Sequence, residues 1–79
     1  MSNKLWEKRR EVLRKTIKEI RQKAGLTQKE LAGKMGKYQS YVSKYESGER
    51  RLDYVELIEV LDACSLNINA FHRMYTKKL

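Results

Sequence analysis

The sequence has few of the residues from which catalytic and metal sites are built. Its 79 residues include one cysteine, one histidine and no proline. A single cysteine cannot form an intramolecular disulfide, and His72 alone provides neither a pair of metal ligands nor a base with an evident partner. No glycine-rich phosphate loop is present. We therefore expect no enzymatic activity, no metal, and no cofactor or other small-molecule ligand.

Long apolar runs are also absent. None approaches the ~20 residues of a membrane span or has the pattern of a signal peptide, so we expect a cytoplasmic chain that does not enter membranes. No internal repeat or glycine-rich linker interrupts the sequence, which predicts a single domain over residues 1–79. A chain of this length buries roughly 60 per cent of its unfolded surface. Cys64 is expected to be a small, unreactive core residue.

Charge, by contrast, is abundant and unevenly distributed. The net charge is +8, and residues 1–52 carry 15 lysines and arginines against 6 acidic residues. Residues 53–79 carry 3 against 4. A basic segment beside a nearly neutral one indicates a polyanionic partner, most commonly nucleic acid. Charge alone does not distinguish DNA from RNA or anionic lipid.

Two short helices joined by a tight turn are predicted between Thr27 and Glu46. Thr27 and Glu30 have the spacing of a capping box, so a helix should begin near Gln28. Gly36 offers the left-handed conformation that ends helices at low cost. The apolar positions of the first helix are Leu31, Ala32 and Met35, and those of the second are Val42 and Tyr45. The remaining faces of the second helix are polar and basic, as in a helix-turn-helix that enters the DNA major groove.

Three further helices complete the predicted all-α fold. Residues 3–24 should form a long first helix, capped by Ser2 or Asn3, since no proline or glycine interrupts them. Asp53 and Asn67 are the expected caps of the fourth and fifth helices. The predicted buried stripes of these three helices are Leu13, Ile17, Ile20 and Ala24; Leu57, Ile58, Leu61 and Cys64; and Ile68, Phe71 and Met74 or Tyr75.

A specific resemblance joins these patterns. The run R-x-x-x-G-L-T-Q-x-x-L-A from Arg21 to Ala32, then Gly36, then V-S-x-Y-E-S-G from Val42 to Gly48, resembles the DNA-binding domain of Cro and lambda repressor, the XRE-type helix-turn-helix family. The resemblance covers about residues 13–72 and leaves residues 1–12 as an N-terminal helical extension. The size is similar to that of restriction-modification controller proteins and small phage-type repressors.

The resemblance implies a compact five-helix fold with an extended first helix. It also implies sequence-specific binding of double-stranded DNA and regulation of transcription by a homodimer on a palindromic operator. By position, the implied base contacts are Gln39, Ser40 and Lys44, with Tyr38 and Ser43 at the margin. The implied phosphate contacts are Thr27, Gln28, Lys37, Tyr41, Arg50 and Arg51. Arg21 and Glu46 are the implied structural ion pair, and Trp6, Ile68, Phe71 and Met74 are the candidates for the dimer interface.

This sequence departs from the family pattern at two places. Tyr38 stands where a small capping residue is common, which puts the placement of Gln39 in doubt, and the loop after Gly48 lacks the usual proline. Two other functions are considered beside DNA regulation. One is a protein-binding module such as the antitoxin partner of a toxin, and the other is non-specific binding of RNA or anionic membrane by the basic first helix. The cluster Lys8-Arg9-Arg10 is either a solvated face or a contact to phosphates or another chain.

Overall fold

The computed structural model describes residues 4–79 and contains five helices, with no strand in this range. The helices are α1 (Lys4–Lys23), α2 (Gln28–Lys34), α3 (Gln39–Ser47), α4 (Tyr54–Ala63) and α5 (Ile68–Lys77). The predicted all-α, five-helix fold with an extended first helix is therefore confirmed. The expected caps Ser2 and Asn3 lie outside the described residues.

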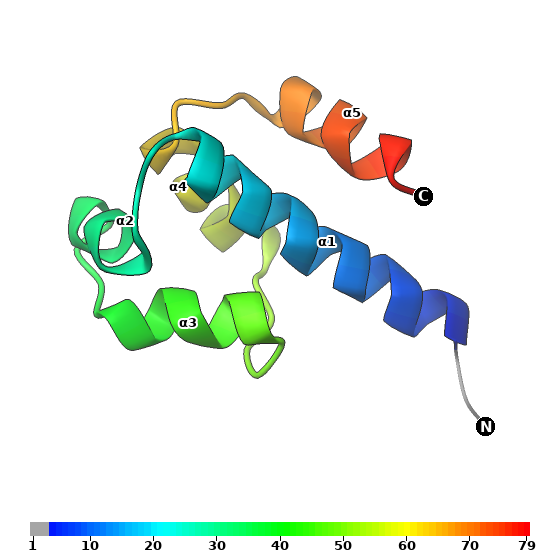
Figure 1. The fold of residues 1–79 in the computed structure, drawn as a ribbon, viewed down its shortest axis with the longest axis horizontal. Helices are drawn as coiled ribbons and strands as arrows, with labels where there is room; N and C mark the ends of the chain where they lie inside the picture. The colour runs from blue at the N-terminus through cyan, green and yellow to red at the C-terminus, as the bar shows by residue number, and fades with distance from the viewer. Residues whose placement is uncertain (1–3) are drawn as a thin grey trace.

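The long helix α1 is central to the arrangement. Figure 1 shows α3 along one side of α1 and α5 along the other, and both helices contact it. The shorter α2 packs against α3 and α4. At 1.5 Å per residue, the 20 residues of α1 extend over roughly 30 Å. Its first turns consequently project beyond the end of α3 (Figure 1).

Side-chain caps define where most of the helices begin. Thr27 at α2 and Asp53 at α4 each form a complete capping box, with Glu30 and Glu56 respectively. The Oδ1 atom of Asn67 accepts a hydrogen bond from the backbone N–H of Ala70 at 2.8 Å, which caps α5. These bonds satisfy donors that the first turn of a helix leaves unpaired. The three predicted caps are therefore confirmed.

All five helices contribute side chains to the hydrophobic core. Its largest fully buried side chains belong to Tyr45, Leu31 and Leu61. Val42 and Tyr45 face inward from α3, as predicted from their spacing. The other apolar members of this core are Ile17, Ile20, Ala32, Val60 and Phe71. Because α3 contributes one narrow buried stripe, its other faces remain open to solvent.

The buried stripe of α1 differs from the prediction. Ala24 was expected in the core, but it is exposed because α1 ends at Lys23 and the chain turns at Gly25, whose φ is +75°. Val12 and Thr16 are buried instead. The Oγ1 atom of Thr16 donates to the carbonyl of Val12 at 2.7 Å, so its hydroxyl can be buried without losing a hydrogen bond. The sequence pattern did not predict Thr16 as a core residue because threonine is polar.

The stripe of α4 also required one correction. Val60 is fully buried next to the expected Leu61, although the sequence spacing did not select it. Leu57, Ile58 and Cys64 are partly buried and pack against the core. Burial raises the pKa of the Cys64 thiol, which keeps it protonated and unreactive. The expectation of an inert cysteine in the core region agrees with this environment.

Candidate nucleic-acid interface

The turn between α2 and α3 holds the two helices in a fixed relation. Gly36 has a φ of +68°, and the N–H of Lys37 donates to the carbonyl of Ala32 at 2.9 Å. Tyr38 has extended backbone angles and occupies the N-cap of α3, but its side chain makes no capping hydrogen bond. Within the first turn of α3, the N–H of Tyr41 donates to the carbonyl of Tyr38 at 3.0 Å.

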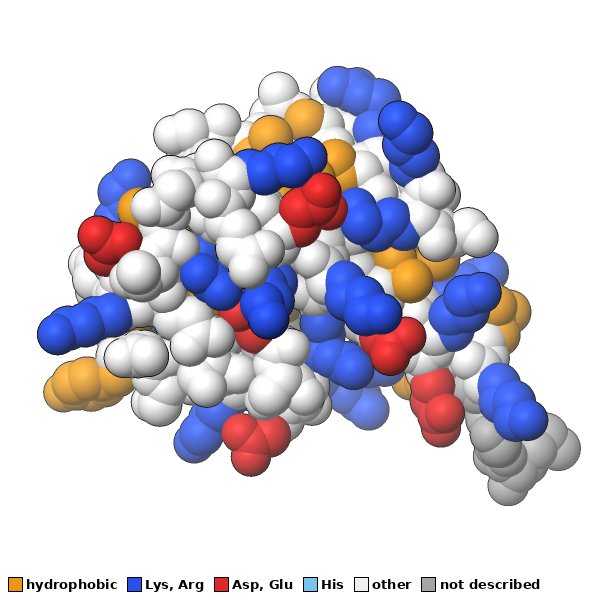
Figure 2. Space-filling view, in the orientation of Figure 1, with side chains coloured by type: hydrophobic (Ala, Val, Ile, Leu, Met, Phe, Trp, Pro, Cys, Tyr) orange, Lys and Arg blue, Asp and Glu red, His pale blue; other side chains and the backbone are white. Residues whose placement is uncertain are grey.

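The outer face of α3 carries the residues that the family resemblance assigns to base contacts. Gln39, Ser40, Ser43 and Lys44 are all exposed. Tyr38 is 87% exposed, and a hydrophobic side chain protrudes beside the start of α3 in Figure 2. No apolar side chain from the core reaches this face, since Val42 and Tyr45 point the other way. Apart from the ring of Tyr38 at its margin, the face consists of amide, hydroxyl and ammonium groups.

A shallow hollow of about 340 Å³ lies beside this face. It brings together residues from the turn, from α3 and from the loop before α4. Its polar lining residues include some that are predicted to contact bases and some that are predicted to contact phosphates. The lining residues are Gly36, Lys37, Tyr38, Ser40, Tyr41, Lys44 and Arg50.

Two of the side chains predicted to contact phosphates lie over the ring of Tyr41. The Nζ atom of Lys37 lies 5.2 Å from the ring centroid, and the Cζ atom of Arg50 lies 4.7 Å from it. Both distances fall within the range of cation–π attraction. The ring of Tyr45 meets Tyr41 edge-on, with 5.6 Å between the centroids. Tyr41 therefore anchors two cations to the core while remaining partly exposed itself.

Arg50 and Arg51 differ in whether the guanidinium group is already bound to an acidic side chain. The guanidinium of Arg50 donates to the carboxylate of Glu56 at 2.5 Å and to the carbonyl of Arg51 at 3.2 Å. The Arg50 hydrogen bond, followed by the one from the backbone of Asp53, lowers the pKa of Glu56 to about 2. Arg51 is exposed and makes no side-chain ion pair within residues 4–79. Of these two arginines, Arg51 is the one with its charge available to a partner.

The ion pair expected between Arg21 and Glu46 is present in the structure. Arg21 Nε donates to Glu46 Oε2 at 2.7 Å, and Nη2 donates to Oε1 at 3.1 Å. The remaining Nη1 donates to the carbonyl of Leu26 at 2.8 Å. The hydrogen bonds to Glu46 raise the pKa of Arg21 against the opposing effect of desolvation. This bidentate geometry connects α1, the following turn and α3.

Gln28 takes part in the same network, which the sequence did not reveal. Its Nε2 atom donates to Glu46 Oε1 at 3.0 Å. This bond helps to orient Glu46 and leaves the second N–H of the amide for the predicted phosphate contact, which remains a prediction. Thr27 is exposed, and its hydroxyl oxygen already accepts the capping bond from Glu30. The Thr27 hydroxyl can still donate its own hydrogen, so the predicted phosphate contacts at the start of α2 remain predictions.

The candidate dimer residues lie in different environments. Phe71 is only 5% exposed and belongs to the protomer's own core. Ile68 and Met74 are partly buried against that core. Trp6 is 50% exposed near the start of α1. Other large hydrophobic side chains left at the surface belong to Leu5, Tyr54, Val55 and Leu79.

Neither a metal centre nor a membrane span is found in the part of the chain that the structure describes. Within residues 4–79, no group of three histidine, cysteine or acidic side chains is arranged to hold a metal ion. None of the helices in the same range is both long and apolar enough to cross a bilayer.

Two short helices joined by this turn, the second of which presents a polar face, define a helix-turn-helix. A helix-turn-helix family model matches residues 17–71, which is more than half of the chain. The chain therefore belongs to the XRE-type helix-turn-helix DNA-binding family, as its sequence motifs indicated. No curated protein sequence is significantly similar to it.

Two solved structures are similar to this chain in both fold and sequence. An XRE-family like protein from Pseudomonas syringae pv. tomato strain DC3000 superposes with a TM-score of 0.86 at 35% identity, covering 95% of this chain and 92% of the other. The wild-type restriction-modification controller protein C.Esp1396I superposes with a TM-score of 0.83 at 27% identity, covering 89% and 90% respectively. The likeness therefore extends over most of each molecule.

Proposed function

We propose that this protein is a sequence-specific regulator of transcription that binds double-stranded DNA as a homodimer. It acts in the cytoplasm, by occupying its operator, and uses no catalytic step. The observation that carries the proposal is the outer face of α3, where Gln39, Ser40, Ser43 and Lys44 are exposed polar side chains and the one large exposed aromatic, Tyr38, lies at the margin. A protein-docking face, as on an antitoxin, would be expected to present apolar anchors instead.

Base readout follows from the chemistry of this face. The Gln39 amide can donate to and accept from one adenine edge, bonding N6 and N7 together. The Lys44 ammonium suits the two acceptors of guanine, O6 and N7. Ser40 lies between them, and Tyr38 and Ser43 lie at the margin. Each well-formed contact discriminates between bases by about 1 to 3 kcal/mol.

Phosphate contacts surround this reading face. Lys37 and Arg51 carry the available charges, and Arg50 lies between them on Tyr41. Thr27 and Gln28 contribute through the start of α2. Each neutralised phosphate lowers the slope of log affinity against log salt by about 0.9. We therefore expect affinity to fall steeply between about 50 and 200 mM salt.

Dimerisation completes the proposed operator complex. One domain of this size contacts too little DNA for high specificity, whereas two recognition helices about 34 Å apart would meet half-sites separated by one helical turn. The partners are proposed to meet through α5 and the exposed Trp6, using the surface edges of Ile68 and Met74. Phe71 supports this surface from the core. The fold unit in each protomer is the segment of about 13–72, with residues 1–12 as its extension.

Selection of bound sites from a random pool of duplex DNA tests this proposal most broadly. The expected result is a two-fold-symmetric consensus whose half-sites lie one helical turn apart. Sedimentation at high protein concentration should show a dimer. A pool that yields no consensus would contradict the proposed function and would favour the protein-binding alternative. A consensus with a single half-site, together with a monomer in sedimentation, would contradict the dimer alone.

A further inference from the structure

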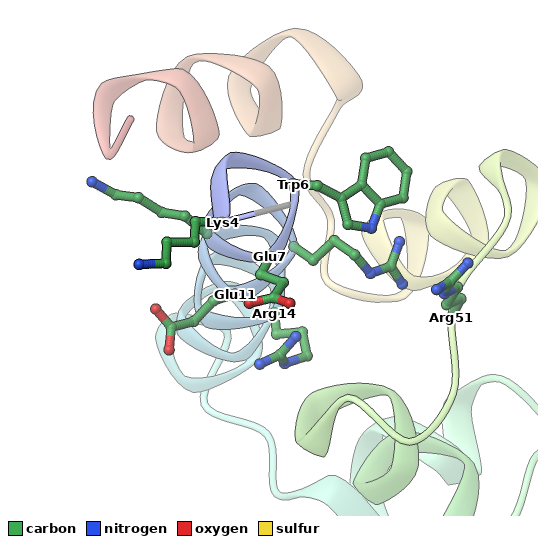
Figure 3. A pocket seen from close by; sticks show the side chains of 8 residues that line it. Lys4, Trp6, Glu7, Glu11, Arg14 and Arg51 are labelled. Carbon is green, nitrogen blue, oxygen red and sulfur yellow. The ribbon is translucent and has the colours of Figure 1, made fainter. Parts of the chain in front are cut away.

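A second concentration of positive charge lies away from the reading face of α3. The first turns of α1 and the loop before α4 border an open hollow of about 660 Å³. Figure 3 shows Trp6 and Arg51 on one side of α1, with the carboxylate of Glu11 turned to the other. Five cationic and two acidic side chains line the hollow together with Trp6. They are Lys4, Lys8, Arg10, Arg14, Arg51, Glu7 and Glu11.

Three guanidinium groups, those of Arg10, Arg14 and Arg51, line this hollow. Partial burial, followed by the charges of Arg51 and Arg14, lowers the pKa of Arg10. Within residues 4–79, none of these three arginines forms a side-chain ion pair. The acidic Glu11 is 3.8 Å from Lys15 instead. Like charges gathered in this way repel one another, and an anion bound among them would relieve the repulsion.

Two packing contacts hold the cluster in place. The guanidinium of Arg10 lies over the ring of Trp6, with 5.6 Å from its Cζ atom to the ring centroid. The side chain of Arg14 crosses Gly48 so closely that a Cβ atom there would be 3.1 Å from its Cζ and Nε atoms. Arg14 thus lies against the C-terminal end of α3, where a cation interacts favourably with the helix dipole. The arginines are positioned by the fold and not by acidic partners.

We propose that Arg10, Arg14 and Arg51 form a second phosphate-binding site, which holds the DNA backbone next to the half-site read by α3. The inference rests on the proposed DNA binding. Arg51 is shared between this cluster and the loop that borders the reading face, so the two surfaces are continuous. A recognition helix contacts base edges mainly with its N-terminal residues. Its C-terminal end, where Arg14 lies, is therefore directed out of the groove toward the backbone.

DNA phosphate fits this site better than an acidic protein does. Planar guanidinium groups bind phosphate oxygens in bidentate fashion. The hollow is open and polar, as a passing backbone requires, and its contacts need no sequence information. The helix-turn-helix family match begins at residue 17, so Arg10 and Arg14 lie in a part of α1 that the match does not include. Arg10, in the N-terminal extension, and Arg14, just after it, would thus add phosphate contacts to those of the helix-turn-helix.

The test compares salt slopes for variants of the full chain on a mixed-sequence duplex and on the selected operator. Arg10→Gln should make the negative slope of log affinity against log salt less steep, by about 0.9 for each copy bound. Arg10→Lys keeps the charge and should retain most of the slope. Lys18→Gln is the matched control, because Lys18 is exposed on the same helix but does not line the hollow. Hydroxyl-radical footprints should show backbone protection that Arg10→Gln loses and Lys18→Gln keeps.

The outcomes separate this inference from the proposed function. If Arg10→Gln matches the wild type in slope and footprint while the preference for the operator persists, the second phosphate site is wrong and the proposed function stands. If the wild type shows no preference for the operator, the proposed function itself fails. Unchanged DNA slopes together with loss of binding to a polyglutamate peptide would overturn the inference in favour of an acidic protein partner.

Discussion

Arg21 Nε lies 2.7 Å from Glu46 Oε2, and this contact joins the end of α1 to the end of α3. The side chains are 10% and 4% exposed, so the pair is almost fully removed from water. Gln28 adds a third hydrogen bond to the same carboxylate. Helix α3 is therefore fixed to the rest of the fold by buried polar groups as well as by its apolar stripe.

Loss of this arginine should be costly. Arg21→Ala strands the Glu46 carboxylate in a buried position and should lower the free energy of unfolding by about 3 to 5 kcal/mol. Urea denaturation measures the change. Lys23→Ala is the control, because it breaks an exposed ion pair with Glu19 and should cost less than about 1 kcal/mol. Equal costs for the two variants would show that the Arg21 pair is not the structural tie described here.

Gly48 should tolerate substitution less well than Gly36. Both have positive φ, +92° and +68°, so alanine is strained at either position by roughly 1 to 2 kcal/mol. At Gly48 the added Cβ would also press on Arg14 at 3.1 Å, whereas Gly36 has open space. The melting temperature of the Gly48→Ala variant should therefore be lower than that of the Gly36→Ala variant. The reverse order would contradict the close approach of Arg14 to the end of α3.

Tyr45→Phe should leave the fold intact. The Tyr45 side chain is 2% exposed, and its hydroxyl has no hydrogen-bond partner among the described residues. Burial raises the pKa of this hydroxyl, which stays neutral. Removing an unsatisfied buried group should leave stability unchanged or raise it by about 1 kcal/mol. A loss of more than about 1 kcal/mol in urea denaturation would mean that the hydroxyl makes a stabilising bond.

The pair of Arg50 and Glu56 predicts a pH dependence. Glu56 has its pKa lowered from 4.5 to about 2, first by Arg50, so its stabilising effect is complete above 4.5 and is lost as pH falls toward 2. Glu56→Gln keeps an acceptor for the capping box but removes the charge. The variant should melt below the wild type at neutral pH, and this difference should disappear by about pH 2. If the difference in melting temperature persists at low pH, the negative charge of Glu56 is not its cause.

Local sequence signals predicted the helices well because they act within one or two turns. Thr27, Asp53 and Asn67 cap helices through bonds to residues three positions away. Gly36 marks a turn because its backbone conformation requires glycine. Such signals depend on sequence neighbours alone. They therefore remain valid before any tertiary packing is known.

The errors came from contacts between distant parts of the chain. Thr16 is buried because its hydroxyl bonds to its own helix, and a polar residue type gives no hint of that. The bond from Gln28 to Glu46, 18 positions away, was likewise not predicted, and the phosphate contact of Gln28 remains a prediction. The cluster of Arg10, Arg14 and Arg51 could not be predicted either, because Arg51 is far from the other two in sequence and comes beside them only in the folded chain. The positions of the exposed α3 residues agreed with the sequence pattern, whereas their base contacts remain a prediction.

The most direct test of the central claim is the ratio of affinities for the selected operator and for scrambled DNA. Gln39→Ala and Lys44→Ala should each lower this ratio, by an amount equivalent to about 1 to 3 kcal/mol, because they remove base contacts. Arg51→Ala should weaken binding to both duplexes about equally, because phosphate contacts carry no sequence information. If the Gln39 and Lys44 variants leave the ratio unchanged, α3 is not the element that reads the sequence.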